Sequence, residues 1–408
     1  MSIWRKYKNT SLIVKMTVGF ALGLLVGVIV GPSAEVLKPL GTILINLLSM
    51  IATPVVFLTV VLAVNKMNPK ELGRTGGKLI LYYGTTTAAA VLIGLGLALW
   101  INPGEALSLP NVTVDQPSNP NFADVLLNIV PSNIFAAFSE GNLMAILFLA
   151  VIVGFTMSHM MFSQDDKMKK YGNYLQEFFE VANTLFFNIL NGILLYAPIG
   201  VFAIAASTFG TQGWGTFTSL LKFTGVFYLG LVILWVVVYT GILRIFHIPI
   251  RSFYANTREA FTTAFFTSSS IASLPVAMDS AKKAGISDKI VHFSLPLGAI
   301  FNSDGGALRM GASIVFAANV TGINFSFVDL MTIVIIGTLL SIGTAGIPAA
   351  GLVTLAAVLT LFDLPLEIVS LIAGVDALIG MGGTASNVVG DIIGAAVVDQ
   401  SEKKTSAQ

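Results

Sequence analysis

The sequence predicts an all-α membrane protein, and three observations support that fold class. The 408 residues are 55% hydrophobic and 11% charged, with a mean hydropathy of +0.85, whereas soluble domains carry about 25% charged residues. Apolar runs of about 20 residues, the length of a membrane-spanning helix, recur along the chain. Lysine and arginine gather in alternate connections between these runs. We therefore expect a multi-pass bundle of helices.

Eight apolar runs are candidates for crossing helices. Basic residues precede the first run and no small-residue cleavage site follows it, which favours a retained helix over a signal peptide. The runs cover residues 11–31, 37–64, 79–101, 124–160, 172–207, 216–246, 290–320 and 364–398.

The basic residues predict which side of the membrane each connection occupies. They occur at 5–8, 66–78, 167–170 and 244–258. The three connections between these clusters contain neither lysine nor arginine. Cytoplasmic loops carry the excess of basic residues, so both termini are expected in the cytoplasm, with Lys403 and Lys404 near the C-terminal end.

Two further apolar segments, 259–281 and 329–361, do not fit this alternation as crossing helices. Arg258 and Lys282 flank the first segment, yet both belong to the cytoplasmic side. We expect both segments to be re-entrant hairpins; the alternative is two ordinary helices with misjudged ends. Small and hydroxyl residues ending in proline lie near the middle of each segment, where a hairpin tip would allow close backbone approach.

Polar residues interrupt the apolar runs that follow the two hairpins. Ile300–Met310 contains an amide, a carboxylate, a guanidinium and two glycines at bilayer depth, and a second interruption is expected over Gly380–Asp391. Broken membrane helices present free backbone groups that bind ions and substrates. A hairpin followed by an interrupted helix, twice and in opposite orientation, indicates an inverted repeat with a substrate site at the repeat interface.

Oxygen-bearing side chains on the two interrupted helices predict a cation site. Thr384, Asn387 and Asp391 share one helix face and could meet Asn302 and Asp304. Such an oxygen cage suits a hard cation, and its neutral ligands favour Na⁺ over a divalent ion. The alternative is that these groups only hydrogen-bond the helices together.

Arg309 is the only lysine or arginine between Lys289 and Lys403. A mid-span arginine should face a cavity or a carboxylate, so its partner is either Asp304 or an anionic substrate. The hydroxyls of Tyr82–Thr87 could also bind Na⁺, although such residues more often hydrogen-bond to the backbone of neighbouring helices.

Composition and motifs exclude several function classes. There is no cysteine, and a net charge of +1 gives no nucleic-acid surface. No catalytic triad, P-loop or dinucleotide motif occurs, so we expect neither an enzyme nor an organic cofactor. Transport would have to draw its energy from an ion gradient.

Motifs spread over the chain resemble those of the dicarboxylate/amino acid:cation symporter family, which includes excitatory amino acid transporters and archaeal aspartate homologues. They are Thr267–Ser270, Leu297–Ala299 with Asn302-x-Asp304-Gly305, Ser341–Pro348, Asp376, and Thr384-x-x-Asn387-x-x-x-Asp391. The resemblance implies eight transmembrane helices, two re-entrant hairpins, a homotrimer, an elevator mechanism and a bacterial or archaeal inner membrane.

The resemblance also implies two parts of the chain. Residues 1–78 and 124–207 would form mainly the trimerisation scaffold. Residues 79–101 and 216–400 would form mainly the transport domain. The latter would contain hairpin 1 at 259–281, the broken seventh helix at 290–320, hairpin 2 at 329–361 and the eighth helix at 364–398.

Three Na⁺ sites follow from the resemblance, and they reverse the first interpretation of the tyrosine–threonine segment. One site would use Gly298, Asn302, Asn387 and Asp391. A second would use Ile300, Ser341, Ile342 and Thr344. A third would use Tyr83, Thr86, Thr87, Asn302 and Asp304. Asp376 would support the ion sites. Since every side-chain ligand is present, the resemblance implies sodium rather than proton coupling.

The substrate pocket departs from the family pattern. The implied pocket residues are Ser268, Ser269, Ser270, Gly306, Arg309, Ala345, Gly346, Gly380, Gly383, Thr384 and Asn387. Among them, Gly383 replaces the arginine that binds the side-chain carboxylate in acidic amino acid transporters, and Gly380 replaces the aspartate that binds the amino group. Gly306 replaces a threonine, and Arg309 replaces a tyrosine.

These departures predict a sodium-coupled importer of a small organic anion. Loss of the aspartate favours a dicarboxylate without an amino group, and Arg309 could extend into the space of the three glycines and bind a second carboxylate. C4-dicarboxylates are expected first, then glutamate or aspartate. The alternatives are a neutral amino acid:Na⁺ symporter, with Arg309 paired to Asp304, and an anion channel or sensor. Partners would be the substrate, Na⁺, the lipid bilayer and two further copies.

Overall fold

The computed structural model describes residues 12–65, 75–105, 107, 130–139, 143–212, 214–344, 350–362 and 364–406, and these residues form helices without any strand. The first half contains α2 (Leu12–Val30), η1 (Gly31–Leu37), α3 (Lys38–Asn65), α4 (Gly77–Ile101), α6 (Ile134–Ser139), α7 (Leu143–Met161) and α8 (Asp166–Gln212). The second half contains α9 (Trp214–Ile233), η3 (Leu234–Tyr239), α10 (Thr240–Ile245), α11 (Ile250–Thr267), α12 (Ser270–Lys283), α13 (Asp288–Phe301), α14 (Asp304–Thr321), α15 (Phe327–Thr344), α16 (Ala350–Leu361), α17 (Glu367–Ala373) and α18 (Asp376–Ser406).

Five helical stretches of the described chain are long and apolar enough to cross a membrane. They are Val14–Leu62, Gly77–Ile101, Asp166–Thr211, Gly215–Ile245 and Leu378–Lys403. Each holds enough residues, at 1.5 Å per residue, to span a hydrocarbon core of about 30 Å. The all-α membrane class predicted from composition is therefore confirmed.

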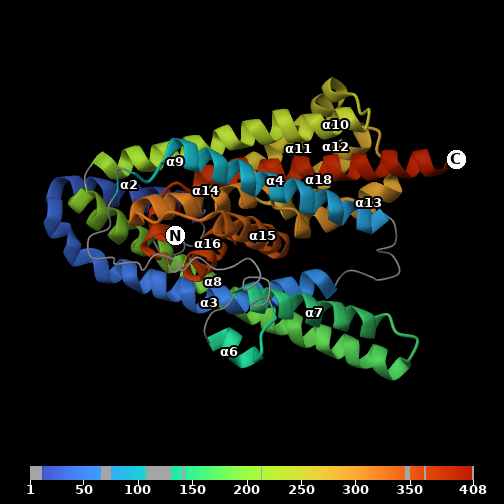
Figure 1. The fold of residues 1–408 in the computed structure, drawn as a ribbon, viewed down its shortest axis with the longest axis horizontal. Coiled ribbons are helices and arrows are strands. Elements are labelled where there is room, and N and C mark those ends of the chain that lie inside the picture. Colours follow the sequence, from blue (N-terminus) through green and yellow to red (C-terminus); the bar gives the residue numbers. More distant parts are fainter. Residues whose placement is uncertain are drawn as a thin grey trace, which may run out of the picture.

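The helices pack in two groups. The helices α2, α3, α7 and α8 contact one another, as do α4, α9, α11, α13, α14 and α18. Figure 1 shows α3, α7 and α8 along one long side and α4, α9 and α18 along the other. Small residues bring α2 against α8, since a Cβ atom at Gly19 or Gly27 would lie 2.5 Å from a backbone oxygen of α8.

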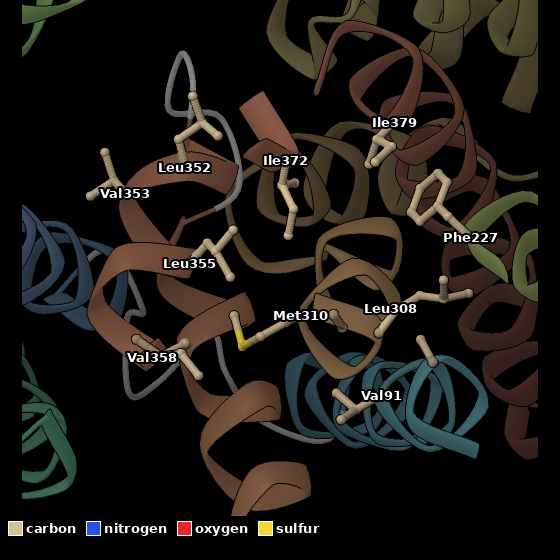
Figure 2. Packing of buried hydrophobic residues seen from close by; sticks show 14 of the residues in the cluster. Val91, Phe227, Leu308, Met310, Leu352, Val353, Leu355, Val358, Ile372 and Ile379 are labelled. Atoms are coloured by element: carbon tan, nitrogen blue, oxygen red, sulfur yellow. The ribbon is translucent and has the colours of Figure 1, made fainter. Parts of the chain in front are cut away.

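Helix α14 lies at the centre of the second group and is almost entirely buried. Its backbone touches that of α4: a Cβ at Gly311 would lie 2.5 Å from the Val91 oxygen, and one at Gly94 would collide with the Leu308 oxygen. In Figure 2, Met310 of α14 extends toward Leu355 and Val358 of α16, whereas Leu308 points to the opposite side, where Phe227 of α9 lies, and Val91 lies on the adjacent α4. This contact fixes α4 beside the start of α14, where the polar residues gather.

The predicted interruption at Ile300–Met310 is a break of only two residues. Helix α13 ends at Phe301, Asn302 is extended, and α14 begins at Asp304, so Gly305 to Arg309 are helical. The break leaves the first backbone N–H groups of α14 facing the space beside α18.

The second interruption, predicted over Gly380–Asp391, is wrong. Helix α18 runs unbroken from Asp376 to Ser406, and the chain turns earlier, at Gly374 and Val375. Glycine here allows close approach instead of ending the helix, because a Cβ at Gly305 would lie 2.5 Å from the Gly383 carbonyl oxygen.

Helices α11 and α12 pack against each other and are joined at two serines. Ser268 has a left-handed backbone with φ of 48°. Ser269 caps α12, since its hydroxyl accepts a hydrogen bond of 3.2 Å from the Ala272 backbone N–H. The corresponding joint between α15 and α16, residues 345–349, lies outside the described residues.

Candidate functional site

The buried carboxylate of Asp304 accepts hydrogen bonds from three hydroxyl groups. It lies in the first turn of α14 and is 0% exposed. Thr86 and Thr87 of α4 donate to its Oδ1 at 3.1 and 2.8 Å. Tyr239 donates to Oδ2 at 2.7 Å. Hydroxyl donors compensate the carboxylate for the water it has lost.

Asn302, in the break between α13 and α14, forms two hydrogen bonds to α18. Its amide nitrogen donates to Asp391 Oδ1 at 2.9 Å and to the Asn387 carbonyl oxygen at 3.0 Å. The Asn387 side chain in turn accepts the Gly305 backbone N–H at 2.8 Å, satisfying a free donor at the start of α14. The structure thus brings Asn302, Asn387 and Asp391 together, with Asp304 two residues further along.

Oxygen atoms from α4 and α18 converge beside Gly298 of α13. A Cβ atom there would lie 2.6 Å from Asp391 Oδ1 and would collide with the Tyr83 hydroxyl. The buried Oδ1 of Asn302 has no hydrogen-bond partner among the described residues. The Asn302 amide, whose nitrogen donates to Asp391, thus carries an unsatisfied buried oxygen, and amide, carboxylate and hydroxyl oxygens are the ligand types that a hard cation requires.

The remaining predicted ion ligands belong to the end of α13 and the end of α15. Ser341 is buried and donates to the Ser303 carbonyl oxygen at 2.6 Å, and Ile300 is half-buried at the end of α13. The side chains of Ile342 and Thr344, and the residues Ala345 and Gly346, lie outside the described part of the chain.

The serines between α11 and α12 present hydroxyl groups at a helix start. Ser268 Oγ is buried and has no hydrogen-bond partner in the described structure, whereas Ser269 caps α12. Ser270 begins α12 and is half-buried, as is Thr384 on α18.

Arg309 forms an ion pair with Asp376, and not with Asp304 as one alternative predicted. Its side chain is 7% exposed, and Nη1 donates to Asp376 Oδ1 at the start of α18. Its other terminal nitrogen, Nη2, is buried and has no hydrogen-bond partner among the described residues. Asp304 is already paired with hydroxyls, which explains the difference. Asp376 therefore contacts the arginine and not the oxygen cluster.

The guanidinium of Arg309 also lies against the first turn of α16. A Cβ atom at Gly351 would lie 2.5 Å from Nη2 and even closer to the rest of the guanidinium. Glycine at this position leaves room for the arginine, so α14, α16 and α18 meet at one guanidinium.

Of the three predicted pocket glycines, only Gly380 borders open space, since a Cβ atom there would meet nothing within 4 Å. A Cβ at Gly383 would be in ordinary van der Waals contact with Gly305 and Phe227 at 3.6 Å. A Cβ at Gly306, in contrast, would collide with Ser303 Oγ. Open space for a side-chain atom therefore lies on α18 at Gly380, one turn beyond Asp376.

Sequence reasoning missed Tyr239, Trp235 and Ser386. The Trp235 Nε1 donates to Ser386 Oγ at 2.7 Å, and Tyr239 is 0% exposed beside Asp304. Both aromatic residues lie in a long apolar run with no motif, so only the three-dimensional contact identifies them.

Fold and site together define a helical membrane protein with a buried ionic centre at a broken helix. The chain belongs to the sodium:dicarboxylate symporter family, whose sequence model matches residues 12–401. The C4-dicarboxylate transport protein of Burkholderia cenocepacia (strain HI2424) is 32% identical over 396 residues, covering 93% of this chain and 90% of that protein. The protein of the same name from Burkholderia mallei (strain SAVP1) is also 32% identical, covering 93% and 91%. Family and relatives are transporters by name, and a transporter is not an enzyme.

Proposed function

We propose that the protein is a sodium-coupled symporter that imports a small organic anion, with C4-dicarboxylates as the leading substrate class. The observation that carries the proposal is the buried guanidinium of Arg309, whose Nη2 has no partner in the described structure. One turn beyond Asp376 on α18, a Cβ atom at Gly380 would meet nothing within 4 Å. The names of the relatives, C4-dicarboxylate transport protein, agree with this substrate class.

Arg309 would bind the second carboxylate of the substrate. A guanidinium has five N–H donors in a fixed fork, so Nη2 can bind a carboxylate while Nη1 keeps its contact with Asp376. Ser270, Thr384 and Asn387 would hold the other carboxylate. With glycine at 380, the turn of α18 nearest this space carries no counter-charge for an ammonium group.

Sodium coupling is supported by the oxygen cluster around Asn302. Gly298, Asn302, Asn387 and Asp391 would form one site, and Tyr83, Thr86, Thr87 and Asp304 would contribute to another. A free amide oxygen, two buried carboxylates and several hydroxyls give a cation all-oxygen coordination. A Na⁺ ion bound at Asn302 would also stabilise the conformation of the break between α13 and α14, next to the proposed substrate pocket.

The division of the helices into two packing groups supports an elevator mechanism in a homotrimer. In this proposal, α2, α3, α7 and α8 form the scaffold. Helix α4 and the helices from α9 onward form the transport domain, with α11–α12 and α15–α16 as re-entrant hairpins. The protein would lie in a bacterial or archaeal inner membrane with both termini in the cytoplasm.

A neutral amino acid:Na⁺ symporter is the second candidate, and one observation favours it. Asp376 already neutralises Arg309, so a substrate without a second carboxylate would leave no bare charge in the pocket. An anion channel or sensor on the same fold is a third candidate, which accumulation of substrate against its gradient in proteoliposomes would exclude.

A thermal-shift screen of the purified protein distinguishes these candidates. A ligand that binds only the folded state raises the melting temperature, with about 2.7 kcal/mol of stabilisation at 100 times Kd. We expect succinate or fumarate to stabilise the protein only when Na⁺ is present. Stabilisation by serine or alanine, with no effect of dicarboxylates, would contradict the leading proposal.

A further inference from the structure

We infer that Tyr239 positions the Asp304 carboxylate for cation binding. This role rests on the proposed Na⁺ coupling, because it assumes that Asp304 is a cation ligand. Tyr239 belongs to none of the motifs in the sequence, and it comes from the helix Trp214–Ile245, which contributes no other predicted site residue.

The two oxygens of Asp304 have different partners. Thr86 and Thr87 contact Oδ1, whereas Oδ2 accepts its hydrogen bond from Tyr239 at 2.7 Å. Both Asp304 and Tyr239 are 0% exposed, so water does not replace a lost donor. The tyrosine thereby fixes the carboxylate plane and keeps Oδ1 directed at the two threonines, which are the expected ligands.

A π-helical turn places the tyrosine there. Residues Leu234–Tyr239 form this turn between α9 and α10, within one continuous helix. A π turn contains more residues than an α turn and therefore rotates the side chains that follow it, and such turns are frequent at functional sites. Here the rotation directs the Tyr239 hydroxyl into the space beside Gly390, where a Cβ atom would lie 2.6 Å from it.

Two contacts tie the π turn to α18 at one residue. Trp235 Nε1 donates to Ser386 Oγ at 2.7 Å, and the Tyr239 hydroxyl lies 3.2 Å from the Ser386 carbonyl oxygen as a second acceptor. Ser386 directly precedes Asn387. The Asn387 side chain accepts a hydrogen bond from the Gly305 backbone N–H, and its carbonyl oxygen accepts one from the Asn302 amide. Tyr239 thus links the hydrogen bonds around Asp304 to those around Asn302, through its contact with Ser386.

The matched experiment compares Tyr239→Phe with Tyr228→Phe. Tyr228 lies on the same long helix and donates to the Leu378 carbonyl oxygen of α18 at 2.7 Å, a hydrogen bond that involves neither Asp304 nor its three hydroxyl partners. Each variant loses one tyrosine hydroxyl: Y228F loses its hydrogen bond to Leu378, and Y239F loses its hydrogen bond to Asp304 together with the longer contact to Ser386. The readouts are the melting temperature without Na⁺, the Na⁺ concentration that gives half of the thermal stabilisation, and the ratio of that concentration to the one for Li⁺.

Removing the partner of a metal ligand typically weakens metal binding by about 10- to 100-fold, and we expect a loss in that range for Y239F. Its Na⁺/Li⁺ ratio should change as well, while Y228F keeps the values of the wild type. A Y239F half-saturation within about twofold of the wild type would overturn the inference. A wild-type protein that Na⁺ does not stabilise would instead refute the proposed sodium coupling.

Trp235→Phe provides a second variant if Y239F does not fold. It removes the hydrogen bond to Ser386 that fixes the π turn and leaves every Asp304 contact chemically possible. The Na⁺ half-saturation should rise in the same direction as for Y239F. An unchanged value in W235F, with Y239F unfolded, would also overturn the inference.

Discussion

The side chains of Arg309 and Asp376 form an ion pair that joins the broken helix to the first turn of α18. The arginine is nearly buried, whereas the aspartate retains 21% exposure. In the proposed pocket, this pair would supply a fixed cation whose Nη2 has no hydrogen-bond partner among the described residues. The net charge that a substrate would meet then depends on a carboxylate from a different helix.

Replacing Asp376 with Asn should separate its two effects on Arg309. The arginine loses its counter-charge, so we expect the protein without substrate to be less stable by about 1–3 kcal/mol. Dicarboxylate binding should strengthen relative to neutral amino acid binding, because the unpaired guanidinium attracts a second carboxylate. Thermal unfolding with and without succinate measures both effects.

Glu402→Gln is the control for this change. The Lys78–Glu402 bridge of 2.5 Å has side chains 26% and 33% exposed. Such partly exposed pairs contribute about 1 kcal/mol or less. A D376N protein as stable as E402Q, with unchanged substrate preference, would show that the Arg309 pair has no role in the pocket.

Gly351→Ala should weaken dicarboxylate binding through Arg309. A methyl group at this position would lie 2.5 Å from Nη2 and closer still to the rest of the guanidinium, and would push it out of its place between α16 and α18. We expect a loss of about tenfold or more in succinate affinity, since 1.4 kcal/mol corresponds to a factor of ten. Titration of succinate by thermal shift measures it, and affinity equal to the wild type would contradict the packing of Arg309 on α16.

Gly94→Ala and Gly96→Ala form a matched pair on α4. Gly94 touches the Leu308 carbonyl of α14, whereas a Cβ at Gly96 would meet nothing within 4 Å. G94A should lower the free energy of unfolding by about 1–3 kcal/mol because two backbones must separate. G96A should be neutral or stabilising by up to about 1 kcal/mol, as expected for alanine in a helix. Equal effects in thermal unfolding would refute the close α4–α14 contact.

Gly298→Ala should abolish one Na⁺ site without removing any ligand. Its methyl group would occupy the space beside the Tyr83 hydroxyl and the Asp391 carboxylate, two of the proposed Na⁺ ligands. We expect Na⁺ to stabilise this variant much less than the wild type, at concentrations that saturate the wild type. Full stabilisation by Na⁺ would show that the cation binds elsewhere.

Composition and charge placement were sufficient to predict the helical membrane class and the break at Asn302. The hydropathy signal is strong because the bilayer requires long apolar helices. The spacing of Asn387 and Asp391 on one helix face also predicted their meeting with Asn302. These features depend on local periodicity, which a single sequence displays.

Other features depend on packing, which periodicity does not reveal. The glycines of α18 suggested a break, yet they allow close helix contact in a continuous helix. The partner of Arg309 was predicted as Asp304 or an anionic substrate, because a mid-span arginine should face a carboxylate or a cavity; its observed partner, Asp376, is 67 residues away in the chain. Tyr239 reaches Asp304 through a π turn that no sequence pattern announced.

Uptake of radiolabelled succinate into proteoliposomes under an inward Na⁺ gradient, with wild type and Arg309→Ala measured side by side, tests the central claim most directly. The wild type should accumulate succinate above the external concentration only when the Na⁺ gradient is present. R309A should lose this accumulation while Na⁺ still raises its melting temperature, which shows that the ion sites remain intact. Equal succinate uptake by the two proteins, or uptake by the wild type that does not depend on Na⁺, would contradict the account.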